Sequence, residues 1–299
     1  MISALTKING YNPTKALFLK EFWDHRRAIL MTPMVITGLF IVFVIVAMVT
    51  GNDLWINDMS LQESMRAGFI EAREEGQSPS FIVTRILFGF SVLLWIAAAF
   101  TITFTALSSL HDERKDGSIL FWKSMPVSDA KEVLIRLATI IFVIPLVIVP
   151  FAIIIELFMV LAMTVIGLYH GIDVVSYIYM NINVPVLMML NIVLPIMTVL
   201  WILPLITWFM LVSSFSRRPP FLIAFAVPAL IIATEEIFFE GSLLLEAIVS
   251  FAVSMGGNFG QGTFFALSSF TEPALYIGFA ISAAMIYGCI YFRKRHTLT

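Results

Sequence analysis

Long apolar stretches separated by shorter polar segments run through the whole chain. Six of them lie at about 30–50, 82–106, 135–165, 186–214, 219–239 and 272–292. Each is at least as long as the roughly 20 residues that a helix needs to cross a bilayer, and none alternates with the period of two that marks a barrel strand. The pattern therefore predicts an all-α integral membrane protein with six transmembrane helices.

Composition agrees with this class. Hydrophobic residues make up 60% of the chain and charged residues 13%, whereas soluble domains average about half and a quarter. The net charge of −2 sums a basic side and an acidic side, so it indicates no nucleic-acid partner. Cys289 is the lone cysteine, so neither an intrachain disulfide nor a cysteine metal cluster is expected.

Basic residues are distributed unevenly between the two ends of the predicted spans. Fifteen of the 18 lysines and arginines fall in segments 7–27, 114–136, 217–218 and 293–295, and only Arg66, Arg73 and Arg85 lie elsewhere. Because short loops rich in lysine and arginine stay in the cytoplasm, both termini are predicted to be cytoplasmic, in a multi-pass protein of the plasma or inner membrane. We expect segment 293–295 to act only as a topological anchor.

A helix is predicted before the first span, at 12–28, starting at Asn12 with Pro13 in its first turn. At 100° per residue, Phe18, Phe22 and Trp23 share one side with Leu19, Ile29 and Leu30, and the other side carries Lys20, Glu21, Asp24 and Arg27. Such a helix is expected to lie in the cytoplasmic membrane interface.

Segment 240–270 is apolar but contains four glycines between Gly256 and Gly262. A seventh full span here would place 293–295 outside, against the charge rule. We therefore predict a re-entrant helical hairpin on the outer side, with the glycines at its turn. Because no Lys-Ser/Thr follows the glycines, they do not form a phosphate-binding loop.

The predicted inside loop, 107–134, has the most distinctive sequence. Charged residues flank an apolar stretch at Ile119, Leu120, Phe121 and Trp122, and Pro126 with Ser128 restarts the chain toward the third span. Two interpretations stay open from the residues alone: a docking surface for a partner, or an aromatic anchor at the lipid interface.

This loop resembles that of the permease subunits of type 2 ATP-binding cassette (ABC) exporters. The family motif has a Glu-Arg pair, a glycine three residues on, an apolar stretch and Pro-Val-Ser, then a basic residue entering the third span. The matching residues are Glu113, Arg114, Gly117, Ile119, Leu120, Pro126, Val127 and Ser128. Arg136 stands where lysine is more usual, which keeps the charge but changes the hydrogen-bonding geometry. The six spans, the interfacial helix and the re-entrant hairpin are further features of that family.

The resemblance implies a transport subunit and not an enzyme. Two permease copies or homologues would assemble with two cytoplasmic ABC ATPases, which bind ATP and magnesium, so this chain itself needs no cofactor or metal. The loop, including Phe121 and Trp122, would receive the ATPase's motion and the helix at Phe18, Phe22 and Trp23 would lie beside it. A first outer loop of about thirty residues favours export of a peptide, a drug-like molecule or a lipid.

Glu156 is the one ionisable side chain deep in a predicted span. A charge at a helix centre costs about 2.5–3.5 kcal/mol on insertion scales, so this residue is expected to face a cavity, to be paired or to be protonated. It either binds a cation or a proton, or holds helices together through hydrogen bonds. Coupling through Glu156 in an ATP-independent transporter or channel is the alternative function, and a membrane anchor without a transport path is a third class.

Two further groups of residues suggest functions. Phe88, Phe100 and Phe104 in the second span contact either an apolar substrate or simply lipid and neighbouring helices. Glu235 and Glu236 suggest an intramembrane metalloprotease, a remote alternative because Phe239 stands where the motif needs arginine and no histidine lies within a predicted span.

Overall fold

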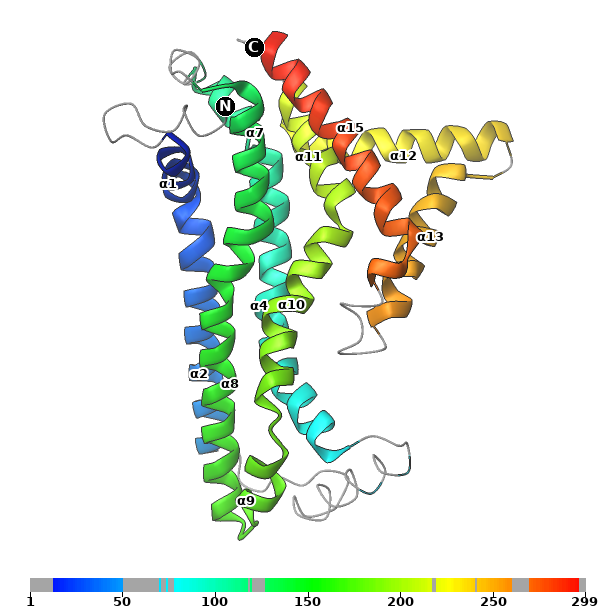
Figure 1. Ribbon diagram of the computed structural model, residues 1–299. Helices are drawn as coiled ribbons and strands as arrows, with labels where there is room; N and C mark the ends of the chain where they lie inside the picture. The colour runs from blue at the N-terminus through cyan, green and yellow to red at the C-terminus, as the bar shows by residue number, and fades with distance from the viewer. Residues whose placement is uncertain are drawn as a thin grey trace. The chain divides into compact units, whose positions relative to one another are not determined.

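The computed structural model describes residues 13–50, 70, 74, 78–117, 119, 127–216, 219–239, 241–259 and 269–295. Every regular element in these residues is helical (Figure 1). Six helices are long and apolar enough to cross a membrane: Thr14–Thr50, Pro79–Lys115, Asp129–Tyr169, Val184–Trp201, Pro220–Phe239 and Pro273–Arg295. The predicted all-α membrane class is confirmed.

The helices fall into two compact units. Unit 1 takes its described residues from Met1–Arg26, Ala99–Pro145 and Ile196–Thr299, and unit 2 comprises those of Arg27–Ala98 and Leu146–Pro195. Three helices, α4 (Pro79–Ser108), α8 (Ile144–Tyr169) and α10 (Val184–Trp201), contribute residues to both. Each unit is described by itself below.

Unit 1 is built around four helices that pack in succession. α1 (Pro13–Arg26) packs on α7 (Asp129–Ala138), α7 packs on α15 (Pro273–Arg295), and α15 lies along α11 (Leu203–Phe215). Gly288 makes the last contact possible, because a Cβ there would lie 2.9 Å from Leu211 Cδ1. The short helix α5 (His111–Lys115) contacts α11, and the π-helical turn η3 (Thr139–Val143) follows α7.

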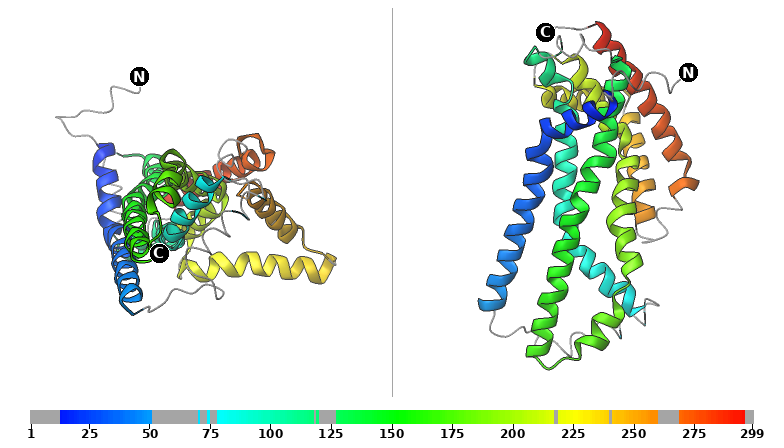
Figure 2. Two further views of the ribbon diagram at one scale, coloured as in Figure 1. Left: turned by 90° about the horizontal axis from the view of Figure 1, so that it is seen from below. Right: turned by 60° about the vertical axis from the view of Figure 1, so that its left-hand side comes forward.

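The remaining helices of unit 1 form an arm. Figures 1 and 2 show α12 (Pro220–Phe239) extending away from α11 and α15, with α13 (Leu243–Phe259) returning from its far end. Trp208 of α11 anchors the near end by donating to the Ala224 carbonyl at 3.0 Å. Glu235 fixes the far turn, because its carboxylate accepts from the Leu244 N–H at 2.9 Å and from the Ser242 hydroxyl at 3.0 Å. A short 3-10 turn, η6 (Ser269–Thr271), precedes α15.

Unit 2 contains the π-helical turn η2 (Arg27–Met31), α2 (Thr32–Thr50) and most of α4, α8 and α10. The described connection from α8 to α10 is folded through α9 (Val174–Tyr177) and the 3-10 turn η4 (Tyr179–Asn181). Gly171 adopts a φ of +68°, which a side chain would oppose. Asp173 then caps α9, and the hydrogen bonds that Ser176 donates to it lower the pKa of the Asp173 carboxyl.

The structure refines one predicted span and the predicted hairpin. The fourth, predicted at 186–214, is divided at Ile202 into α10 and α11, with Pro204 in the first turn of α11, where its missing N–H removes no helical hydrogen bond. In segment 240–270, α13 continues through Gly256 and Gly257 to Phe259, so the predicted turn does not begin there. Asn12 and residues 260–268 lie outside the described residues.

Candidate functional site

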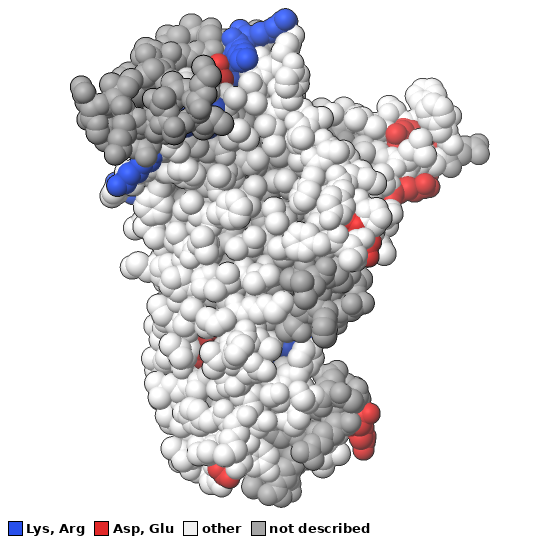
Figure 3. Space-filling view, viewed as in Figure 1, with Lys and Arg blue, Asp and Glu red and all other residues white. Residues whose placement is uncertain are grey.

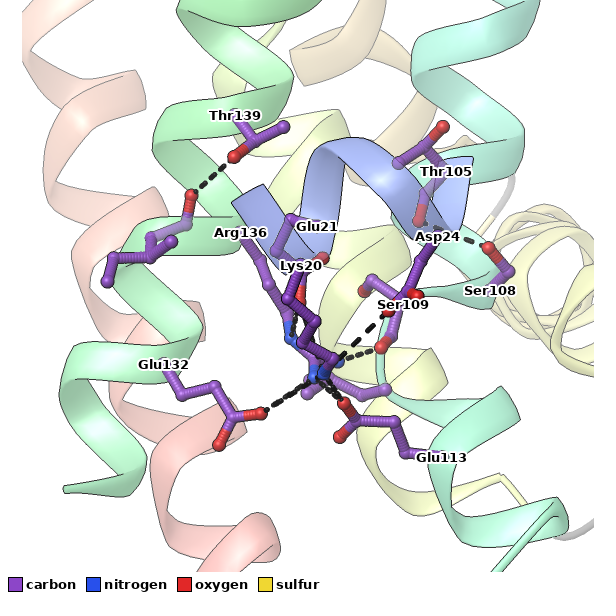
Figure 4. A network of polar contacts seen from close by, with 12 residues as sticks. Lys20, Glu21, Asp24, Thr105, Ser108, Ser109, Glu113, Glu132, Arg136 and Thr139 are labelled. Atoms are coloured by element: carbon purple, nitrogen blue, oxygen red, sulfur yellow. Dashed lines mark hydrogen bonds and ion pairs between the residues drawn. The ribbon is translucent and has the colours of Figure 1, made fainter. Parts of the chain in front are cut away.

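Glu113 of α5 binds cations from three different helices of unit 1. Its carboxylate pairs with Lys20 of α1 and Arg136 of α7, and its Oε2 lies 3.1 Å from Nη1 of Arg293 on α15. Figure 4 shows the cationic ends of Lys20 and Arg136 converging between Glu113 and Glu132. A helix of five residues is thereby tied to α1, α7 and α15.

The partners on α7 are placed by helical spacing. Glu132 and Arg136 are one turn apart, and Glu132 Oε1 lies 2.9 Å from Arg136 Nη2. Arg136 also lies 3.2 Å from Glu21 and donates to the Ser109 carbonyl. The planar guanidinium fork lets one side chain reach all these acceptors, which a lysine ammonium could not do in the same geometry.

The ionic groups of this site are buried and close to balanced. We call it the Glu113 network, and among the described residues it comprises Lys20, Glu21, Asp24, Glu113, Asp129, Glu132, Arg136 and Arg293. Lys20, Arg136 and Arg293 supply three positive charges against the buried carboxylates of Glu21, Glu113 and Glu132, and the carboxylates of Asp24 and Asp129 are more exposed. Removing one member would leave an uncompensated buried charge, which is strongly destabilising.

Arg293 corrects a prediction. Segment 293–295 was expected to serve only as a topological anchor, yet Arg293 is 3% exposed and pairs with Glu113, Asp129 and Glu132. Its Nη2 lies 2.5 Å from Glu132 Oε2. Only Lys294 and Arg295 are exposed. The reason is that the last turn of α15 packs against α7, so one of three consecutive basic residues must point inward.

Arg114 ties the same short helix to α11. Its Nη2 donates to the carbonyls of Ser213 at 2.5 Å and Ser216 at 3.0 Å, at the C-terminal end of α11 where backbone carbonyls lack helical partners. In return, Ser213 Oγ accepts from the backbone N–H groups of Leu110 and His111, both at 3.0 Å. Each helix thus caps the other.

The Glu-Arg pair of the loop motif is therefore buried and not part of an exposed docking surface. Gly117 has a φ of +71° and ends α5, and Ile119 is 1% exposed. Ser128 caps α7, with its side chain accepting from the Lys131 N–H at 3.3 Å. Both ends of the loop are fixed by these contacts. Leu120, Phe121, Trp122 and Pro126 lie outside the described residues.

The predicted helix before the first span is present as α1, but two of its charged residues, Lys20 and Glu21, face inward, while Asp24 stays exposed. Glu21 is 5% exposed and Lys20 is largely buried, whereas Leu19 and Trp23 are exposed and Phe18 and Phe22 are half-buried. The cause is the ionic attraction of Arg136 and Glu113 for this side of α1. On the apolar side, Leu19 and Trp23 remain exposed, as contact with lipid would require.

Sequence reasoning missed several members of the network. Arg293 was expected only to anchor the topology, and Asp129, Glu132, Ser213 and Ser216 were not singled out. One signal was available: Asp129, Glu132 and Arg136 recur at helical spacing, three and four residues apart, where the third span begins. Their distant partners come from tertiary packing, which no local pattern encodes.

Charge is also unevenly distributed over the surface of unit 1. Figure 3 shows basic side chains around the end of α15 and over α1, and acidic side chains on the α12–α13 arm. Lys294 and Arg295 belong to the basic end, and Glu235, Glu236 and Glu246 belong to the arm. Glu235 serves as the cap of α13, which explains one member of the Glu235–Glu236 pair without a metal.

Glu156 lies in unit 2 and is 2% exposed. Asn191 Nδ2 of α10 donates to its carboxyl oxygens at 2.8 and 3.0 Å, and Ser91 Oγ of α4 lies 3.2 Å from Oε1. We call these three residues the Glu156 cluster. They join three helices, as the hydrogen-bonding interpretation of Glu156 expected.

The phenylalanines of α4 differ in exposure. Phe100 is 62% exposed and Phe104 is 58% exposed, while Phe88 is half-buried. Phe100 and Phe104 are four residues apart and so share one side of the helix. Contact of these two side chains with an apolar substrate or with lipid would require this exposure.

Comparisons with known proteins gave no match. No protein-family model matches the chain, and neither the curated proteins nor the solved structures contain a match to it. Among the described residues, no group of three or more histidine, cysteine, aspartate or glutamate side chains could hold a metal ion.

Proposed function

We propose that this chain is the membrane-spanning subunit of an ATP-driven exporter, and that α5 is its transmission element. A separate cytoplasmic ABC ATPase would bind the loop that follows α5. Its movement on ATP binding would be passed through Glu113 and Arg114 to the long helices. The observation that carries the proposal is that one five-residue helix is bonded to α1, α7, α11 and α15.

The chemistry of the site suits such a role. Ion pairs and charge-assisted hydrogen bonds between buried groups are directional and hold a fixed geometry. A displacement of α5 must therefore either break contacts with a large free-energy cost or carry the attached helices with it. An ordinary connecting loop would not need buried ionic contacts to three helices and charge-assisted hydrogen bonds to a fourth.

The rest of the proposal concerns assembly and cargo. Two permease copies or homologues would assemble with two ATPases in the plasma or inner membrane, with both termini in the cytoplasm. The unequal distribution of basic residues supports this orientation. The cargo would be a peptide, a drug-like molecule or a lipid, and ATP and magnesium would be bound by the ATPase.

The test separates ATPase binding from transmission. We expect a cytoplasmic ATPase to co-purify with the chain in a fixed ratio and to be lost when Phe121 and Trp122 are replaced by alanine. With Glu113→Gln, the ATPase should still co-purify and hydrolyse ATP, but substrate export should fall at least tenfold. A Lys294→Ala variant, changed at an exposed basic residue of α15, should behave as wild type.

A chain that purifies without an ATPase and transports equally well after the Phe121 and Trp122 replacements would refute the proposal. Equal losses of ATPase binding in Glu113→Gln and in the loop variants would refute the transmission role of Glu113. That result would place the residue in the docking surface itself.

A further inference from the structure

The Glu156 cluster contains more hydrogen-bond acceptors than donors. Asn191 Nδ2 has two hydrogens, and the Leu187 carbonyl at 3.1 Å takes one of them. That leaves one hydrogen for the two carboxyl oxygens of Glu156. The same Leu187 contact assigns the orientation of the Asn191 amide, because the reverse orientation would set two oxygens against each other.

Ser91 has a single hydroxyl hydrogen and two acceptors within reach. The Phe88 carbonyl lies 2.8 Å from Ser91 Oγ, and Glu156 Oε1 lies 3.2 Å from it. An ionised Glu156 offers about four lone-pair sites. It would receive at most one hydrogen from Asn191 and one, along the longer contact, from Ser91. A charge buried with so few donors is costly.

A protonated Glu156 gives each donor hydrogen named above, and its own, one acceptor. Its Oε1–H donates to Ser91 Oγ, the Ser91 hydroxyl donates to the Phe88 carbonyl, and Asn191 donates to Glu156 Oε2 and to the Leu187 carbonyl. Every hydrogen is then used once. No charge is left in the apolar environment.

No cation compensates Glu156 among the described residues. Arg85, the basic residue of α4, is exposed and lies over the Phe81 ring at 5.1 Å, and none of the ion pairs of the described residues includes Glu156. The described parts of α2, α8 and α10 carry no other charged side chain. Asp173 lies beyond the end of α8 and caps α9.

The geometry also disfavours a bound metal ion or ammonium group. A cation needs oxygen acceptors turned toward it, yet Asn191 turns its N–H₂ toward the carboxyl group, and its Oδ1 is buried without a hydrogen-bond partner in the described structure. We propose that the Glu156 cluster is a proton-binding site, in which a neutral Glu156 links α8 to α4 and α10. This inference does not depend on the exporter proposal.

Infrared spectroscopy of the purified chain in lipid tests this directly. At about pH 7, the wild type should show the carbonyl band of a protonated carboxylic acid, and Glu156→Gln should lose it while staying folded. Glu246→Gln removes an exposed acid of α13 and should leave the band unchanged. A wild-type spectrum without that band, or a band that persists in Glu156→Gln, would overturn the proposal.

A second measurement addresses the cation. The thermal midpoint of the wild type should not respond to sodium or to small ammonium ions more than that of Glu156→Gln does. A rise seen only in the wild type would overturn the proton assignment in favour of a cation site. Neither measurement involves an ATPase, so a failure here is distinguishable from a failure of the exporter proposal.

Discussion

Glu113 in unit 1 and Glu156 in unit 2 are both buried carboxyl groups, yet their neighbours differ in kind. The Glu113 carboxylate pairs with Lys20, Arg136 and Arg293, while the Glu156 carboxyl group has hydrogen bonds with an amide and a hydroxyl and no ion pair among the described residues. The first must be ionised to satisfy its partners, and the second is satisfied when neutral. Burial alone therefore does not determine what an acidic residue does in this protein.

The difference also bears on mechanism. Ionic contacts in the Glu113 network are long-range and hold whole helices in a charge-balanced arrangement. The contacts of the Glu156 cluster are short-range hydrogen bonds, and each contributes about 1 kcal/mol net. The first arrangement suits transmission of a movement, and the second suits a fixed helix contact.

Removing Arg136, the most deeply buried cation of the Glu113 network, should have the largest effect. Arg136→Ala leaves Glu21, Glu113 and Glu132 short of positive charge in a buried site, so we expect a loss of about 3–5 kcal/mol in the free energy of unfolding. Tryptophan fluorescence during denaturant unfolding in detergent would measure it. Lys294→Ala should stay within about 0.5 kcal/mol of wild type, and similar values for the two variants would contradict the network.

The same isosteric change at the two acids should separate the regions. Glu113→Gln removes a charge that three cations need, and we expect a loss of about 1.5–3 kcal/mol, the range for hydrogen bonds to charged groups. Glu156→Gln keeps a neutral, hydrogen-bonding group and should change the free energy of unfolding by less than about 1 kcal/mol. Equal losses in the free energy of unfolding at both positions would contradict the inference that Glu113 is ionised and Glu156 is neutral.

Arg114→Lys should have a moderate effect. Lysine keeps the positive charge but cannot reach the Ser213 and Ser216 carbonyls with a planar fork. We expect a loss of about 1.5 kcal/mol, with co-purification of the ATPase retained. Arg295→Lys, at an exposed position where Arg295 lies over the Tyr291 ring, is the matched control. An equal effect at both arginines would show that the reciprocal cap contributes nothing.

The transmembrane helices, Glu156 and Arg293 differ in how far their roles could be predicted from the sequence. Span positions followed from the apolar runs, because about 20 residues are needed whatever the packing. Glu156 could be recognised as a special residue because a single acid within an apolar run must be paired, protonated or exposed to a cavity. Arg293 could not be recognised in this way, because a basic residue at the end of a span fits the charge rule whether its side chain points outward or inward. Its partners Glu113 and Glu132 lie far away in the chain.

The smallest predicted effect concerns Ser128, a residue of the loop motif. If Ser128 acts as the N-cap of α7, then Ser128→Ala should cost about 1 kcal/mol and Ser128→Asp, another good N-cap, should restore most of it. The loss of stability should be confined to unit 1, because α7 places Glu132 and Arg136 in the Glu113 network. The infrared band of the Glu156 carboxylic acid should therefore not change. If Ser128 instead contacts an ATPase, aspartate would add a charge to that contact, and Ser128→Asp would weaken ATPase co-purification while leaving the free energy of unfolding intact.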